Sequence, residues 1–94
     1  MYHILAKEDL NPVTRMFEVL APAVARKAQA GQFVIVRVRD EGERIPLTVT
    51  GYDRERGTIT LVVQEVGKTT MEMGAMQVGD DLASLTGPLK ELLE

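Results

Sequence analysis

The chain has 94 residues, enough for a single domain, and 45% hydrophobic with 27% charged residues is the composition of a soluble globular protein. It has no cysteine, which excludes disulfides, thiolate nucleophiles, Cys-ligated zinc and iron–sulfur clusters, and its single histidine, His3, cannot form a histidine-rich metal site. Because 14 acidic residues against 11 basic ones give a formal net charge of −3, we expect no nucleic-acid partner and no membrane partner.

The sequence lacks the pattern of a signal peptide or a membrane span. No basic segment is followed by an apolar core, and the longest apolar stretch, residues 19–25, is interrupted by Pro22. We therefore expect a cytoplasmic protein, or a cytoplasmic piece of one.

The first thirty residues predict two strands and a short connector. Residues 2–7 and 13–20 have strand-like patterns, and the Asn11-Pro12 break between them allows the second strand to pair back on the first. Residues 21–30 are rich in alanine, but the proline near their start limits any helix to a short turn.

Residues 32–39 have the clearest strand pattern of the chain. Valines recur at every second position and point to one face, while the other face carries Phe33, Ile35, Arg37 and Arg39. This strand is therefore expected to have two faces of different chemistry.

A second antiparallel pair is predicted from residues 45–53 and 58–66. The loop between them contains Gly57, which tolerates the positive φ angle of a tight hairpin. Pro46 lacks an N–H group and is expected near the beginning of its strand or at an unpaired edge.

The last part of the chain predicts one helix and one strand. Residues 69–76 are expected to form a two-turn helix, because Thr69 and Glu72 have the spacing of a capping box. A turn at residues 79–81 then leads into a short last strand, residues 82–85. Together these elements predict an all-β fold, a closed or nearly closed antiparallel barrel with one short helix.

A first candidate binding segment precedes and begins the strand at residue 45. Arg44 can bind a phosphate through two parallel hydrogen bonds, and the strand stiffened by Pro46 can offer backbone groups to a flat heterocycle, with Thr48 adding a hydroxyl. The alternative is an exposed arginine beside an edge-strand proline.

A second candidate segment, Gly67, Lys68, Thr69 and Thr70, lies just before and at the start of the expected helix. Unpaired N–H groups gather at a helix start and favour an anion such as phosphate. The segment lacks the spacing of a P-loop, and an ordinary capped helix is the alternative. We interpret the nearby methionines as core residues and Asp80 and Asp81 as turn residues, not metal ligands.

Several short motifs occur in one order along the chain: residues 30–34, 44–48, 67–70, 79–82 and 85–89. In this order they resemble the flavin-binding barrel of the ferredoxin–NADP reductase superfamily, over nearly all of residues 2–89. Within it the chain resembles the alpha subunit of NADH-dependent ferredoxin–NADP oxidoreductase, sulfide dehydrogenase subunits, and the electron-transfer subunit of dihydroorotate dehydrogenase.

The resemblance implies a six-stranded antiparallel Greek-key barrel that holds FAD, with residues 1–89 as the FAD-binding domain. It assigns Arg44 to the flavin pyrophosphate, Pro46 and Leu47 to the face and edge of the isoalloxazine ring, and Thr48 to the vicinity of the redox centre. It also implies that the segment from Gly67 to Thr70 contacts the pyrophosphate through backbone N–H groups.

The chain departs from the family in three ways. Pro46 and Leu47 stand where many members carry an aromatic residue, and Lys90 stands where a glycine is expected. Residues 90–94 are interpreted as a truncated tail that leads to an absent NAD(P)-binding domain. We therefore do not expect this chain alone to be active.

The function that the resemblance implies is electron transfer between NAD(P)H and a ferredoxin-type or partner-subunit acceptor. The expected partners are FAD, the missing NAD(P)-binding domain, a partner subunit of the parent enzyme, and a second copy of this chain in a homodimer. The alternative is a small β-barrel interaction module without a cofactor, similar to accessory barrels of translation factors, which leaves Arg44 and Thr48 unexplained.

Overall fold

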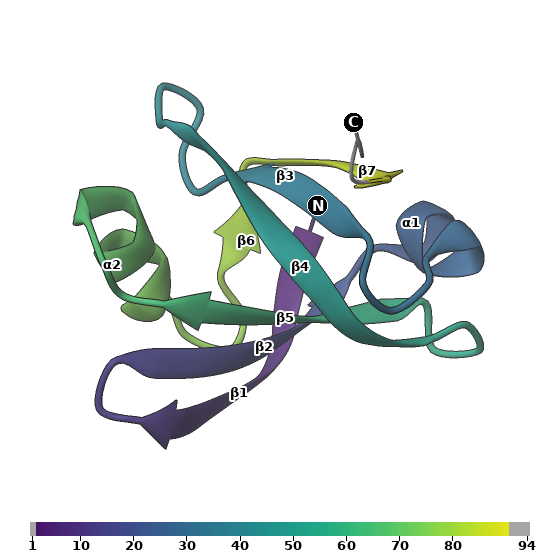
Figure 1. The fold of residues 1–94 in the computed structure, drawn as a ribbon, viewed down its shortest axis with the longest axis horizontal. Coiled ribbons are helices and arrows are strands. Elements are labelled where there is room, and N and C mark those ends of the chain that lie inside the picture. The colour runs from purple at the N-terminus through teal and green to yellow at the C-terminus, as the bar shows by residue number, and fades with distance from the viewer. Residues whose placement is uncertain (1, 91–94) are drawn as a thin grey trace.

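The computed structural model describes residues 2–90, which form strands and two short helices (Figure 1). In chain order these elements are β1 (Tyr2–Asn11), β2 (Thr14–Leu20), α1 (Pro22–Lys27), β3 (Phe33–Arg37), β4 (Arg44–Asp53), β5 (Thr58–Gln64), α2 (Lys68–Gly74), β6 (Asp81–Leu82) and β7 (Ser84–Leu89). Neither helix among these residues is long and apolar enough to cross a membrane.

The strands form a single antiparallel sheet in the order β6-β1-β2-β5-β4-β3-β7. The two outermost strands, β6 and β7, are separated in the chain by Ala83 alone, and the Ala83 N–H donates to the carbonyl oxygen of Arg37 on β3. Because consecutive strands occupy the two edges, the sheet curls round into a nearly closed barrel (Figure 1).

The expected all-β antiparallel barrel is confirmed, with seven strands in place of six. The single last strand predicted at residues 82–85 is two strands, since the chain leaves β1 at Leu82 and joins β3 from Ser84 onward. Strand β7 also continues to Leu89, beyond the expected end of the last strand at residue 85. Of the expected tail at residues 90–94, all but Lys90 lies outside the described residues.

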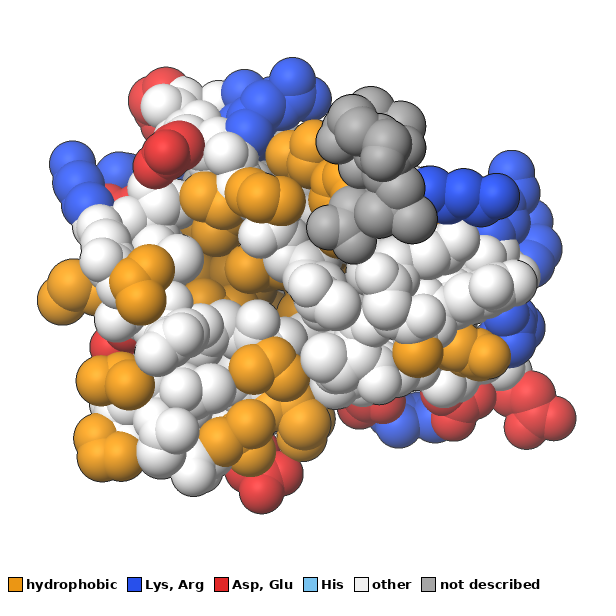
Figure 2. All heavy atoms as spheres, in the orientation of Figure 1, with side chains coloured by type: hydrophobic (Ala, Val, Ile, Leu, Met, Phe, Trp, Pro, Cys, Tyr) orange, Lys and Arg blue, Asp and Glu red, His pale blue; other side chains and the backbone are white. Residues whose placement is uncertain are grey.

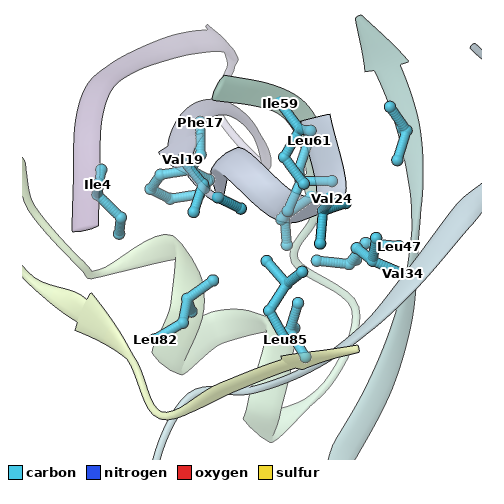
Figure 3. Close-up of a cluster of buried hydrophobic side chains, with 14 of the residues drawn as sticks. Ile4, Phe17, Val19, Val24, Val34, Leu47, Ile59, Leu61, Leu82 and Leu85 are labelled. Carbon is cyan, nitrogen blue, oxygen red and sulfur yellow. The ribbon is translucent and has the colours of Figure 1, made fainter. Parts of the chain in front are cut away.

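Apolar side chains from alternating strand positions fill the barrel (Figure 3). On β5 the side chains of Ile59, Leu61 and Val63 are fully buried, and on β3 those of Val34 and Val36 are too. Burying a side chain of this kind contributes about 1.5–3 kcal/mol relative to leaving it in water. The period-two pattern of the sequence thus accounts directly for which face of each strand lies inside.

Strand β4 pairs with different neighbours along its length. Residues 49–53 pair with β5, across a register shift between Val49 and Gly51, whereas residues 44–48 pair with β3. The first half of β4 therefore has β3 as its partner. After β5 the chain continues into α2, and the side chain of Met73 in this helix is fully buried in the core.

The capping box predicted for α2 is wrong in its residues. The helix begins one residue earlier, with Gly67 as its N-cap, and the Thr70 hydroxyl accepts the N–H groups of Val66 and Gly67 at 2.9 and 3.0 Å. Thr69 instead donates to Glu43 at 2.8 Å. Glu72 forms an ion pair with Arg39, and so neither predicted partner caps the helix.

Candidate functional site

The outward face of β4 carries three of the predicted binding residues. Alternation along the strand exposes Arg44, Pro46 and Thr48, while Ile45 and Leu47 are turned into the core and only 8% exposed. Figure 3 shows Leu47 beside Val34, its register partner on β3. Leu47 therefore has little side chain to offer a ligand, and its contribution comes mainly from its backbone.

Two guanidinium groups lie at the beginning of this face. Arg44 is the register partner of Arg37 on β3, and the Arg37 side chain donates to Ser84 Oγ at 3.3 Å and to the Asp40 carbonyl at 2.9 Å. The Arg44 side chain is exposed and has no hydrogen bond or ion pair with any other residue in the range 2–90. Its donors are therefore free to bind an anion.

A groove of about 760 Å³ lies at the other end of the same face. Its lining is mostly apolar and comes from β3, β4 and the end of β7, with the residues Gly31, Phe33, Pro46, Leu47, Thr48, Leu89 and Lys90. Phe33 is the register partner of both Thr48 and Leu89, so its ring lies in the middle of this wall. The volume is in the range of small-molecule sites.

The start of α2 contributes backbone donors. Among the described residues, no acceptor receives the N–H groups of Lys68 and Thr69, which belong to the first turn and cannot be bonded within the helix. The Lys68 side chain is exposed beside them. The helix has only seven residues, so its dipole is small, and the free N–H groups matter more.

Two polar contacts tie the loop between β3 and β4 to α2. Thr69 Oγ1 donates to Glu43 Oε1 at 2.8 Å, and Arg39 forms an ion pair with Glu72 at 3.0 Å. Figure 2 shows acidic and basic side chains gathered round this loop, which lies above α2 in Figure 1. Arg44 directly follows Glu43, so the beginning of β4 and the start of α2 lie on the same side of the barrel.

The predicted site residues thus form two groups. Pro46, Leu47 and Thr48 line the groove. Arg44 and the segment from Gly67 to Thr70 form the second group, which does not line the groove. Arg44 lies on the same face of β4 as the groove residues, and the contact between Glu43 and Thr69 connects the start of β4 to the segment.

Sequence reasoning missed Phe33 and Arg37 as site residues. The alternation in residues 32–39 did place both on the face opposite the core valines. What the sequence lacked was the register, which sets Phe33 against Thr48 and Arg37 against Arg44. The neighbouring strand thus places an aromatic residue in the groove wall beside the β4 motif, which has none.

The arrangement fits an elongated ligand with an anionic part and a flat apolar part. At about 3.3 Å per strand residue, Arg44 and Thr48 are separated by about 13 Å along β4. The free guanidinium and the free N–H groups lie at one end of this path, and the apolar groove with its Phe33 ring lies at the other. A dinucleotide that carries a diphosphate and a fused ring system has this form.

Comparison with known protein families identifies the chain's family. The model of the oxidoreductase FAD-binding domain matches residues 2–92. The chain belongs to this family. FAD is thus the cofactor of the domain, which agrees with the fit between the groove, the free cation and a dinucleotide. The alternative of an interaction barrel without a cofactor is not favoured.

Two curated relatives are similar to the FAD-binding domain over most of its length. An uncharacterised protein in the adh 3′ region of Clostridium beijerinckii is 45% identical over 89 residues, which cover 95% of this chain and 30% of the relative. A homologue of the electron transfer subunit of dihydroorotate dehydrogenase B (NAD⁺) from Thermotoga maritima is 44% identical over 73 residues, 78% of this chain and 26% of the relative.

Solved structures agree with this assignment. A chain of the NADH-dependent reduced ferredoxin–NADP oxidoreductase superposes with a TM-score of 0.93 at 37% identity, covering 100% of this domain and 34% of that chain. The cytochrome b5 reductase domain of Ulva prolifera nitrate reductase, at 21% identity and a TM-score of 0.65, shares the fold. The domain spans about a third or less of the first relatives that it matches.

Proposed function

We propose that this domain holds FAD for an enzyme that passes electrons between NAD(P)H and a ferredoxin-type or partner-subunit acceptor. The names of the relatives support this proposal: one is an electron transfer subunit homologue, and another is an NADH-dependent reduced ferredoxin–NADP oxidoreductase. When bound, FAD supplies the redox chemistry by accepting a pair of electrons and giving them up again. The residues of this chain bind and orient it.

The observation that carries the proposal is the free guanidinium of Arg44. Arginine can form two parallel hydrogen bonds with phosphate oxygens, and each charge-assisted hydrogen bond contributes about 1.5–3 kcal/mol. The Arg44 guanidinium is exposed and has no partner in residues 2–90, so no internal contact has to be broken before it binds the diphosphate.

The start of α2 is proposed to complete the diphosphate site. The N–H groups of Lys68 and Thr69 donate to phosphate oxygens, and the Lys68 ammonium adds a second positive charge. Gly67 permits close approach, since nothing lies within 4 Å of the position that its Cβ would take. The Thr70 hydroxyl fixes the backbone of this turn through its bonds to Val66 and Gly67.

The ring end of FAD is proposed to lie in the groove. Pro46 and Thr48 contact the ring from β4, the Leu47 backbone contacts its edge, and Thr48 places a hydroxyl near the redox centre. Phe33 adds an aromatic surface from β3, which supports a flat ring system. The groove walls exclude part of the solvent from the ring.

The remaining partners follow from the length of the relatives, of which this domain spans 26–34%. We propose that an NAD(P)-binding domain delivers the hydride and that a partner subunit receives electrons in the parent enzyme, in the cytoplasm. The domain alone is then expected to bind FAD but not to oxidise NAD(P)H. Formation of a homodimer by the domain is a separate prediction, which sedimentation analysis tests.

Titration with FAD tests the site. Binding is expected to quench flavin fluorescence, and Arg44→Ala is expected to raise Kd about tenfold or more, equivalent to about 1.4 kcal/mol or more. Arg26→Ala is the matched control, because Arg26 is also exposed but lies on α1, outside the groove. Equal Kd values for Arg44→Ala, Arg26→Ala and the unaltered chain would refute the proposed role of Arg44.

A further inference from the structure

Lys90 lines the groove, yet the proposed function gives it no role. It directly follows Leu89, the last residue of β7, which pairs with Phe33 across the sheet. Among the described residues that line the groove, Lys90 alone is ionisable, and the others are apolar, glycine or threonine. The groove wall therefore combines a mostly apolar surface with one positive charge.

A positive charge in such a place acts differently on the two redox forms of a flavin. Reduction by two electrons adds negative charge to the ring system at neutral pH, whereas the oxidised ring is neutral. An ammonium group at the edge of a partly desolvated groove interacts more strongly with the charged form than it would in bulk water. It therefore stabilises the reduced flavin selectively.

The other cations of the site are assigned to the diphosphate. Arg44 is about 7 Å from Pro46 and about 13 Å from Thr48 along β4, and Lys68 lies at the start of α2, outside the groove. The negative charge of the diphosphate that both are proposed to bind offsets their positive charges, which reduces their effect on the ring. Lys90 is thus the cation placed to act on the ring.

We propose that Lys90 raises the reduction potential of the FAD held by this domain, by stabilising the reduced ring electrostatically. The inference rests on the proposed function, because it requires the flavin ring to lie in the groove. It goes beyond cofactor binding, since it assigns the tuning of the cofactor's potential to one side chain. Lys90 then favours acceptance of electrons from the donor over their release to the acceptor.

The test measures the midpoint potential of bound FAD by anaerobic equilibration with a reference dye. Lys90→Gln is expected to leave the Kd of oxidised FAD within twofold of the original and to weaken binding of reduced FAD about tenfold. For a two-electron couple, a tenfold change in the equilibrium constant is about 30 mV, here toward a more negative potential. Raising the salt concentration to about 1 M should shrink the difference.

Two further variants make the result specific. Lys90→Arg keeps the charge and should keep the potential, whereas Lys27→Gln removes an exposed lysine at the end of α1, outside the groove, and should leave the potential unchanged. Equal potentials for Lys90→Gln and the unaltered chain, or the same shift in Lys27→Gln, would overturn the inference while leaving the proposed function intact. If the unaltered chain binds no FAD, the proposed function fails, and this inference fails with it.

Discussion

The packing of α2 against Glu65 allows a sharp test of how the helix is held. A Cβ atom added at Gly74, the last residue of α2, would lie 1.9 Å from Glu65 Oε2 and 2.7 Å from Glu65 Cδ. The Glu65 side chain is only 18% exposed and forms an ion pair with Arg15 at 3.4 Å. Gly74→Ala therefore forces the Glu65 carboxylate out of its place.

The expected change in the free energy of unfolding on Gly74→Ala is the sum of opposing contributions. Alanine is favoured over glycine in a helix by up to about 1 kcal/mol. Against this, a displaced Glu65 adopts a poorer rotamer at a cost of about 0.5–1.5 kcal/mol and loses its partly buried ion pair with Arg15, worth about 1 kcal/mol or more. Gly74→Ala should therefore lower the free energy of unfolding by about 1 kcal/mol, which lowers Tm by roughly 4–8 °C.

A double-mutant cycle with Glu65→Ala provides the assay, with thermal and urea unfolding as the measurements. Glu65→Ala removes the three atoms nearest to the new methyl group, and in that background Gly74→Ala should become neutral or stabilising. The sign of the effect should thus reverse between the two backgrounds. A loss of stability that is the same with and without Glu65 would refute this account of the helix packing.

Two further predictions concern the start of α2 and the core. Thr70→Val removes the acceptor for two backbone N–H groups and should lower the free energy of unfolding by about 1 kcal/mol. Thr69→Val loses only an exposed contact with Glu43 and should change the free energy of unfolding by no more than about 0.5 kcal/mol. Urea unfolding measures both, and the opposite ranking would contradict the observed cap. Phe17→Ala leaves a cavity at a fully buried position and should lower the free energy of unfolding by about 3–5 kcal/mol, measured by the same assay. A decrease below about 1 kcal/mol would contradict the place of Phe17 in the core.

Much of the barrel could be predicted because its strands follow a period of two. The valines of β3 and the apolar residues of β5 alternate with exposed positions, and this pattern alone separates the inner face from the outer face. The same alternation explains the outward direction of Arg44. It also explains why Leu47, which the family resemblance assigned to the ring, is turned into the core.

The features that could not be predicted depend on contacts between distant segments. The division of the last strand at Ala83 requires its hydrogen bond to Arg37, and the aromatic wall of the groove requires Phe33 to be in register with Thr48. At the start of α2, two successive threonines are equivalent by local spacing. They are distinguished by the start of the helix at Gly67, which brings the Val66 and Gly67 N–H groups to the Thr70 hydroxyl, and by Glu43 on another loop, which accepts from Thr69.

The division of β4 between two neighbours has a consequence for how the domain assembles. Its second half pairs with β5 across a short hairpin, so this part can form from residues that are close in the sequence. Its first half belongs to a wall that is completed only when Ser84 pairs with Arg37, after most of the chain has been made. Local pairs form early and distant pairs late. The surface that receives the cofactor is therefore completed late, as is the pairing of Tyr2 with Leu82 at the other edge of the sheet, and a bound dinucleotide stabilises contacts between segments that are distant in the sequence.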